Sequence, residues 1–329
     1  MKRRHLLLTI AIALSPARAL ADCASHTSTC IDADTFWPRP GPSTFTFVGS
    51  AETTARGQFG LGMVVSYLRR PVVLVAPSTD PAGLRIDAVD HVVDTTYLWS
   101  YGVADRADLF AALPTTVYQT GSGASALAAQ TTQDMPHTVL RDARLGVSYA
   151  LTSREPPFGA AARLEIALPT GDEQSFAGDR SVVGIPSFAA DFRRGPWLLA
   201  AEVGARLRRT ANLLGARVGS QLWLGLGAGV HVVQPQTLSV LVEAFALPTF
   251  AEQRREAYDF AQRTYVEWSR GQPLVPAEWA LSIRSVPVPN GDFSIALAGG
   301  GRLPLTSDPG ITTPVYRFSL VLRYAPVTR

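Results

Sequence analysis

Alternating side-chain character recurs along almost the whole chain. In the stretch GSQLWLGLGAGVHV, residues 219–232, every second residue from Leu222 to Val232 is apolar, and the residues between them, apart from Trp223, are small or polar. A period of two is typical of a β-strand whose two faces meet different surroundings. About twelve such segments can be placed, near residues 57–69, 90–102, 106–119, 138–151, 158–170, 182–194, 196–209, 215–232, 236–249, 275–287, 291–304 and 314–325. The sequence therefore predicts an all-β protein.

The connections between these segments alternate between tight and long. Residues 102–106, 194–196, 234–235 and 287–291 are short and rich in Gly, Pro, Asp and Asn, whereas residues 71–89, 120–137 and 250–274 are long and irregular. A soluble sandwich also shows a period of two, so the period alone does not decide the architecture. Tight turns at one end and long loops at the other, with an even strand number, are typical of a transmembrane antiparallel β-barrel in the outer membrane, with both termini periplasmic.

Aromatic residues fit the same architecture. Several lie near strand ends on the apolar face, where amphipathic rings favour the interface between lipid and water. They are Tyr67, Trp99, Tyr101, Trp197, Trp279 and Tyr324. Any one of them could equally be ordinary packing, but together they favour a membrane barrel.

The N-terminus indicates export. Residues 1–21 combine a basic start, an apolar stretch from Leu6 to Leu14 and small residues before Ala21, which is the layout of a secretory signal peptide. Cleavage after Ala21 would remove four positive charges from the formal +3 and leave −1, so bulk charge gives no reason to expect nucleic-acid binding. Residues 22–56 are then a periplasmic N-terminal segment that could plug the barrel, and residues 57–329 are the barrel.

The two cysteines, Cys23 and Cys30, lie close together in a chain expected to be exported, where a disulfide can persist. Two thiols lack the further ligands of a structural zinc site, and no cofactor is predicted. The mature histidines, at 26, 91, 137 and 231, have no neighbouring serine and amide in a recognisable pattern. No catalytic residue is therefore predicted.

The stretch LPTGDEQSFAGD, residues 168–179, contains two Gly-Asp turns at the end of an apolar run. A phosphate-binding loop would need a lysine and a following helix, and neither is present. We interpret the stretch as a strand end leading into an external loop. A second hypothesis is a surface cation site formed by the hard oxygen ligands of Asp172, Glu173 and Asp179, although their spacing is not that of an EF-hand.

Charged residues alternate away from the apolar face of the strands, and charge facing lipid is costly. We therefore expect these residues to line the lumen: Asp94, Asp108, Arg144, Arg163, Glu165, Asp191, Arg193, Glu202, Arg206, Arg208, Glu243, Arg284, Arg317 and Arg323. Ion pairs that stiffen the wall are one interpretation, and a polar lining that selects solutes is the other. The excess of arginine would favour anions.

Two segments could close a barrel of this intermediate size. One is the N-terminal segment. The other is the stretch from Thr249 to Leu274, where Tyr258, Ala261, Tyr265 and Trp268 are spaced three or four residues apart, which predicts a short amphipathic helix on the outer rim.

Several stretches resemble known bacterial barrels. YGVADRADLFAALPTTVYQTG (101–121), RDARLGVSYALTS (141–153), LEIALPTGDEQSFAGDRS (164–181) and FAADFRRG (188–195) are similar to the N-terminal barrels of the OmpA family of Gram-negative bacteria. They also resemble the outer-membrane transporter-like proteins named after the meta pathway of phenol degradation. The resemblance implies a non-enzymatic outer-membrane barrel with a transport or structural role. Because the chain stops just after its last strand, no peptidoglycan-binding residues are carried over.

The sequence leaves three functions open. The first is porin-like passage of small solutes or ions through an Arg-rich lumen. The second is a non-conducting structural or interaction barrel like those of the OmpA family, and the third is an outer-membrane phospholipase. Expected partners are outer-membrane lipid, lipopolysaccharide, the barrel assembly machinery and a periplasmic or envelope protein, with no nucleic acid.

Overall fold

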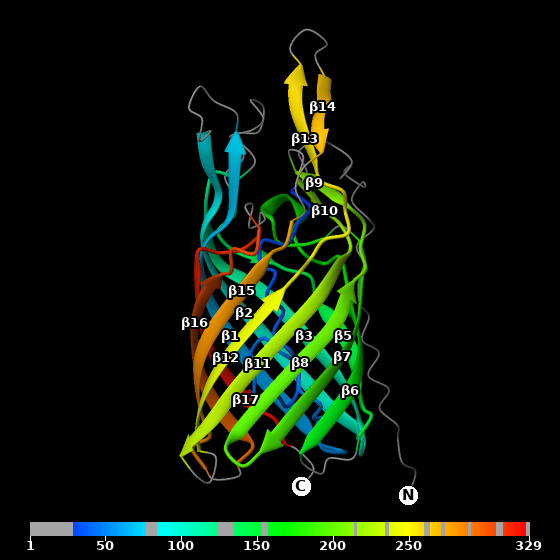
Figure 1. Ribbon diagram of the computed structural model, residues 1–329, viewed down its shortest axis with the longest axis vertical. Coiled ribbons are helices and arrows are strands. Elements are labelled where there is room, and N and C mark those ends of the chain that lie inside the picture. The colour runs from blue at the N-terminus through cyan, green and yellow to red at the C-terminus, as the bar shows by residue number, and fades with distance from the viewer. Residues whose placement is uncertain are drawn as a thin grey trace, which may run out of the picture.

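The computed structural model describes residues 29–326 except 77–83, 124–134, 153–156, 180, 214–215, 234–236, 260–263, 271–273, 289–290 and 307–311. Twelve strands form one closed antiparallel ring (Figure 1). In chain order they are β1 (Phe59–Ala76), β2 (Leu84–Ala104), β3 (Ala107–Thr120), β5 (Arg144–Ala150), β6 (Phe158–Ala167), β7 (Val183–Arg194), β8 (Trp197–Arg206), β11 (Gln221–Val233), β12 (Leu238–Ala246), β15 (Ala277–Ser285), β16 (Phe293–Arg302) and β17 (Tyr316–Tyr324).

Each strand pairs with the next in this order, and β1 closes the ring by pairing with β17 from Leu61↔Tyr324 to Arg69↔Tyr316. The strands run obliquely around the barrel (Figure 1). Short connections such as those between β2 and β3 and between β7 and β8 gather at one end, here called the turn end. The other end, the loop end, carries the longer connections. The predicted alternation of tight and long links therefore holds except between β1 and β2, whose connection is no longer than the one between β15 and β16.

The two faces of the wall differ in the way that the period of two predicts. Large apolar side chains are exposed on the outer face of strands all around the ring, among them Leu145, Leu199, Leu226, Leu281 and Phe318. Trp99, Tyr101, Trp197, Trp279 and Tyr324 are also exposed. An apolar exterior on a ring with no open edge is the arrangement that lipid requires.

Among the described residues, no helix is both long enough and apolar enough to cross a membrane.

Three local expectations were wrong. The residues expected to form an amphipathic helix instead form a β-hairpin, β13 (Arg254–Asp259) and β14 (Thr264–Arg270), which projects from the loop end. Much of the expected loop 71–89 is strand, because the apolar run Val72–Ala76 pairs with Leu84–Val89 across a bulge beside Pro71. Two expected strands are divided, giving the short strands β4 (Val139–Leu140) and β10 (Ala216–Val218), and β10 pairs with β9 (Ala211–Leu213).

Residues 29–56 lie inside the barrel and run along its length (Figure 1). At the loop end, the amide of Ala33 donates to the carbonyl of Phe176, just after the single-turn 3-10 helix η1 (Glu173–Ser175). At the turn end, the amide of Thr54 donates to Asp108 on β3. We call residues 29–56 the inner segment. Most of its residues are buried, so it shares one core with the inward faces of the strands.

Candidate functional site

The fourteen charged residues expected in the lumen all lie on the inward face of the wall or just beyond a strand end. Eleven are buried, and Arg193, Arg208 and Arg284 are partly exposed. The eleven buried residues do not face open solvent, because the inner segment lies inside the wall that carries them. The candidate functional site is therefore the contact between the inner segment and the wall.

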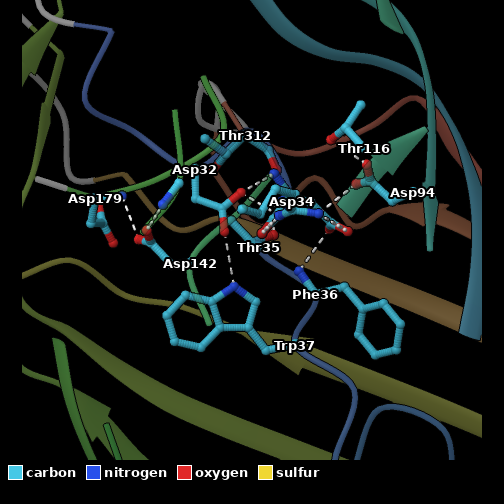
Figure 2. A network of polar contacts seen from close by, with 12 residues as sticks. Asp32, Asp34, Thr35, Phe36, Trp37, Asp94, Thr116, Asp142, Asp179 and Thr312 are labelled. Carbon is cyan, nitrogen blue, oxygen red and sulfur yellow. Dashed lines mark hydrogen bonds and ion pairs between the residues drawn. The ribbon is translucent and has the colours of Figure 1, made fainter. Parts of the chain in front are cut away.

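At the loop end, the inner segment is held by a network of ion pairs (Figure 2). Arg317 on β17 holds Asp34 with two nitrogens, at 2.6 and 3.2 Å, and pairs with Glu278 on β15 at 2.9 Å. Arg141 pairs with Asp32, Asp34 and Asp94. Both guanidinium groups therefore join the inner segment to the wall, and the charges are buried where water competes little.

In the middle of the barrel, one wall carboxylate binds three successive amides of the inner segment. Glu243 on β12 accepts hydrogen bonds from the backbone N–H groups of Thr46, Phe47 and Val48 at 2.8, 2.6 and 3.0 Å. Glu202 on β8 accepts from the amide of Gly49 at 2.9 Å. A Cβ at residue 49 would stand 2.0 Å from a terminal guanidinium nitrogen of Arg163, so any larger residue at this position would force the Arg163 side chain to shift.

Cations and aromatic rings alternate across the same region. The guanidinium of Arg206 lies 4.0 Å from the ring centre of Trp37 in the inner segment and 5.1 Å from that of Trp223 on β11. Arg39 also stands over Trp223, at 5.3 Å, and pairs with Glu165 and Glu202. Trp223 stacks on Phe245 in turn. Desolvated cation–π contacts of this kind contribute about 2 kcal/mol each, so these side chains fill the cross-section with strong contacts.

The lumen does not have the cation excess predicted from the sequence. Glu278 also faces inward and is fully buried, and the inner segment contributes Asp32 and Asp34 beside the wall arginines. The sequence reasoning missed Glu278, although its position next to the outward-facing Trp279 gave the signal. The preference for anions was inferred from the wall alone and does not take account of the carboxylates that the inner segment adds.

Asp172, Glu173 and Asp179 are not brought together as a cation site. Asp172 caps η1 by accepting from the amide of Gln174, and Asp179 pairs with Arg208. Within the described residues, no group of three or more His, Cys, Asp or Glu side chains could hold a metal ion. The first interpretation of this stretch, a strand end followed by a turn, agrees with β6 ending at Ala167. The disulfide between Cys23 and Cys30 remains a prediction, since Cys23 lies outside the described residues.

Asp142, between β4 and β5, fastens the same loop. Its carboxyl group accepts from the amides of Gly171 at 2.8 Å and Asp179 at 2.6 Å. Burial, opposed by these two hydrogen bonds, raises the pKa of the Asp142 carboxyl from 3.8 to about 7, and the nearby Asp32 and Asp179 act in the same direction as burial. At a pH between these two values, the Asp142 carboxyl is protonated in the folded protein and ionised in the unfolded chain.

This proton predicts a pH dependence. Between about pH 4 and pH 7 the folded state binds more protons than the unfolded state, so the free energy of unfolding should fall as the pH rises through this window and level off above it. The thermal unfolding midpoint in detergent should therefore be higher at pH 5 than at pH 8. Asp142→Asn should flatten this part of the profile. An unchanged slope in the variant would show that another group is responsible.

The structure gives no support for nucleophilic catalysis in the described part of the chain. Nδ1 of His231 lies 2.8 Å from Oγ of Ser239, but Ser239 is fully buried and cannot meet a substrate. His91 contacts Tyr67 and Arg69, and His137 contacts the carbonyl of Gln119. His26 lies outside the described residues.

Comparison with solved structures shows which known proteins have a similar fold. An outer-membrane channel from Pseudomonas putida F1 superposes with a TM-score of 0.57 at 12% identity, over 83% of this chain and 97% of that chain. The chain folds as an outer-membrane β-barrel. The NanC porin has a TM-score of 0.45 at 8% identity, covering 80% of this chain and 98% of that one. The Pseudomonas putida toluene transporter TodX has a TM-score of 0.36 at 10% identity, covering 88% and 98%.

The identity values limit the comparison to the fold of the barrel. No protein-family model matches the sequence, and no curated protein matches it. The resemblance to the OmpA family is therefore not confirmed. What the structural comparison supports is the coarser part of that expectation, an outer-membrane barrel of the kind that includes channels.

Proposed function

We propose that this barrel is an outer-membrane channel for small solutes or ions that is closed at rest by the inner segment. The single observation that carries the proposal is the position of residues 29–56, which run along the lumen and contact the inward side chains of many strands. The superposition on an outer-membrane channel, over 83% of this chain and 97% of that chain, supports it. In this proposal the turn end faces the periplasm, and passage requires the inner segment to move.

The contacts suit a removable closure better than a permanent filling. Many of them are hydrogen bonds and ion pairs between groups that water can also satisfy, so displacement of the segment into an aqueous lumen replaces these polar contacts rather than leaving them unmet, and the apolar contacts of Phe36, Phe45 and Phe47 are lost. A barrel filled only by its own side chains would have no such element. The alternative, a non-conducting structural barrel, predicts that the inner segment never leaves.

A disulfide lock tests the proposal. The Cγ2 atom of Val48, where a cysteine sulfur would stand, lies 3.3 Å from the position of a Cβ added to Gly225. This distance suits a disulfide in the double variant Val48→Cys/Gly225→Cys. In planar bilayers we expect current steps from the wild type and from the reduced variant, and none from the oxidised variant.

The matched control is Ser66→Cys/Ser319→Cys. These hydroxyl oxygens are 2.8 Å apart on the paired wall strands β1 and β17, so the disulfide would join wall to wall and leave the inner segment untethered. Its oxidised form should conduct like the wild type. Current through the oxidised Val48–Gly225 variant would show that the inner segment is not the gate. A silent wild type and silent reduced variant would reject the channel altogether.

A further inference from the structure

The central part of the inner segment is bound through its main chain. Over residues 43–50, Arg323 donates to the carbonyl of Ser43, and Glu243 accepts three successive amides. Glu202 then accepts the amide of Gly49, and Arg163 donates to the carbonyl of Ser50. Carboxylates thus meet the donors and guanidinium groups meet the acceptors. All four wall side chains are buried, so each bond is charge-assisted and shielded from water.

The side chains of the same residues fill an apolar chamber. The ring of Phe47 contacts those of Phe36 and Phe245, with centres 4.4 and 5.7 Å apart. Two wall glycines on β11 make room for the other two side chains. A Cβ at Gly227 would stand 2.8 Å from the ring of Phe45, and one at Gly225 would stand 3.3 Å from Val48. The wall is therefore shaped for apolar side chains on a peptide backbone.

We propose that this chamber, lined by Glu243, Glu202, Arg323 and Arg163, is a binding site for short apolar peptides, and that residues 43–50 occupy it as a built-in ligand. The inference rests on the proposed function, because a solute can enter only when the inner segment withdraws. The ligand class follows from the wall groups. A simple anion would meet two carboxylates and a simple cation two guanidinium groups, whereas a peptide offers donors and acceptors together.

A binding experiment can distinguish recognition of the peptide main chain by the wall from non-specific binding of apolar side chains. It needs variants whose inner segment has left the chamber. The full-length variant Phe45→Asp/Phe47→Asp places new carboxylates beside Glu243 and in the apolar chamber, so the inner segment should detach and leave the wall intact. A second full-length variant, Gly49→Leu, should detach it by collision with Arg163. A fluorescein-labelled peptide with the sequence of residues 42–51, PSTFTFVGSA, is then titrated with each variant in detergent, and anisotropy is measured.

The decisive comparison uses backbone esters. Replacing the amide of Phe47 by an ester removes a donor to Glu243 and keeps every side chain. The control peptide carries the ester at Thr44, whose amide makes no hydrogen bond within the described residues. We expect the unmodified peptide to bind both variants but not the wild type. The Phe47 ester should bind at least about tenfold more weakly, and the Thr44 ester should bind like the unmodified peptide.

Equal binding of the two ester peptides, or equal binding to variant and wild-type protein, would overturn the peptide site. Conductance of the same variants, recorded without peptide, separates this result from the proposed function. If the variants conduct but bind the two ester peptides equally, the proposed channel stands and the peptide site is rejected. If the variants bind the Phe47 ester more weakly but do not conduct, the peptide site stands and the channel is rejected.

Discussion

Replacing Glu243 by alanine is expected to release residues 46–48 from the wall and to open the lumen. Three buried amides would lose their common acceptor, and an unmet buried donor costs about 1–3 kcal/mol. The segment should therefore spend much more of its time displaced. Amide hydrogen exchange at residues 46–48 should speed up by at least about tenfold, and current steps in planar bilayers should become more frequent than in the wild type.

Asp105→Ala provides the control, because it removes an exposed carboxylate in the turn between β2 and β3. It should leave both exchange and conductance unchanged. If Glu243→Ala exchanged as slowly as the wild type at residues 46–48, the carboxylate would not be what holds the segment.

Replacing Arg317 by alanine should produce the largest loss of stability. The change would leave Asp34 and Glu278 as buried carboxylates without their shared cation, and breaking a buried pair in this way costs about 3–5 kcal/mol. The loss should appear as a lower temperature for the heat-induced mobility shift of the folded barrel on gels. The matched change Arg209→Ala, at an exposed position, should alter stability by no more than about 0.5 kcal/mol.

A neutral replacement of Arg317 together with its two carboxylate partners sharpens this test. The triple variant Asp34→Asn/Glu278→Gln/Arg317→Met removes the charges together, so it leaves no unpaired ion in the interior. It should therefore be more stable than Arg317→Ala alone. Equal stability of the two variants would show that the lost packing, rather than the unpaired carboxylates, causes the effect.

The strands of the wall could be predicted from the sequence because the alternation of apolar and polar side chains is visible within each short segment. Leu222 to Val232 must place apolar side chains on one face whatever the rest of the chain does, and twelve such segments specify a closed ring. The errors also have local causes. The spacing of three or four residues from Tyr258 through Ala261 and Tyr265 to Trp268 predicts one helix, but Tyr258 and Trp268 lie on different strands of a hairpin, in which Tyr258 is paired with Tyr265.

The interior was harder to predict because its contacts are not local. Asp34 meets Arg317 across 283 positions, and Glu243 meets Thr46 across 197. Such distant residues are not related by any periodic pattern in the sequence. The backbone carbonyls and amides that bind the wall side chains are common to every residue, so the sequence does not mark them. Residues 22–56 could be proposed as a plug from their position, but the role of Glu243 as a main-chain acceptor could not be read from its residue type.

The route of residues 29–56 also bears on how the protein is made. The segment leads directly into β1, and β1 pairs with β17, so the seam of the ring joins the first strand to the last. The ring cannot close before β17 is present, because β17 is the last strand of the chain and the partner of β1. Residues 29–56 are continuous with β1, so they must either be enclosed when β17 pairs with β1 or enter the finished barrel afterwards.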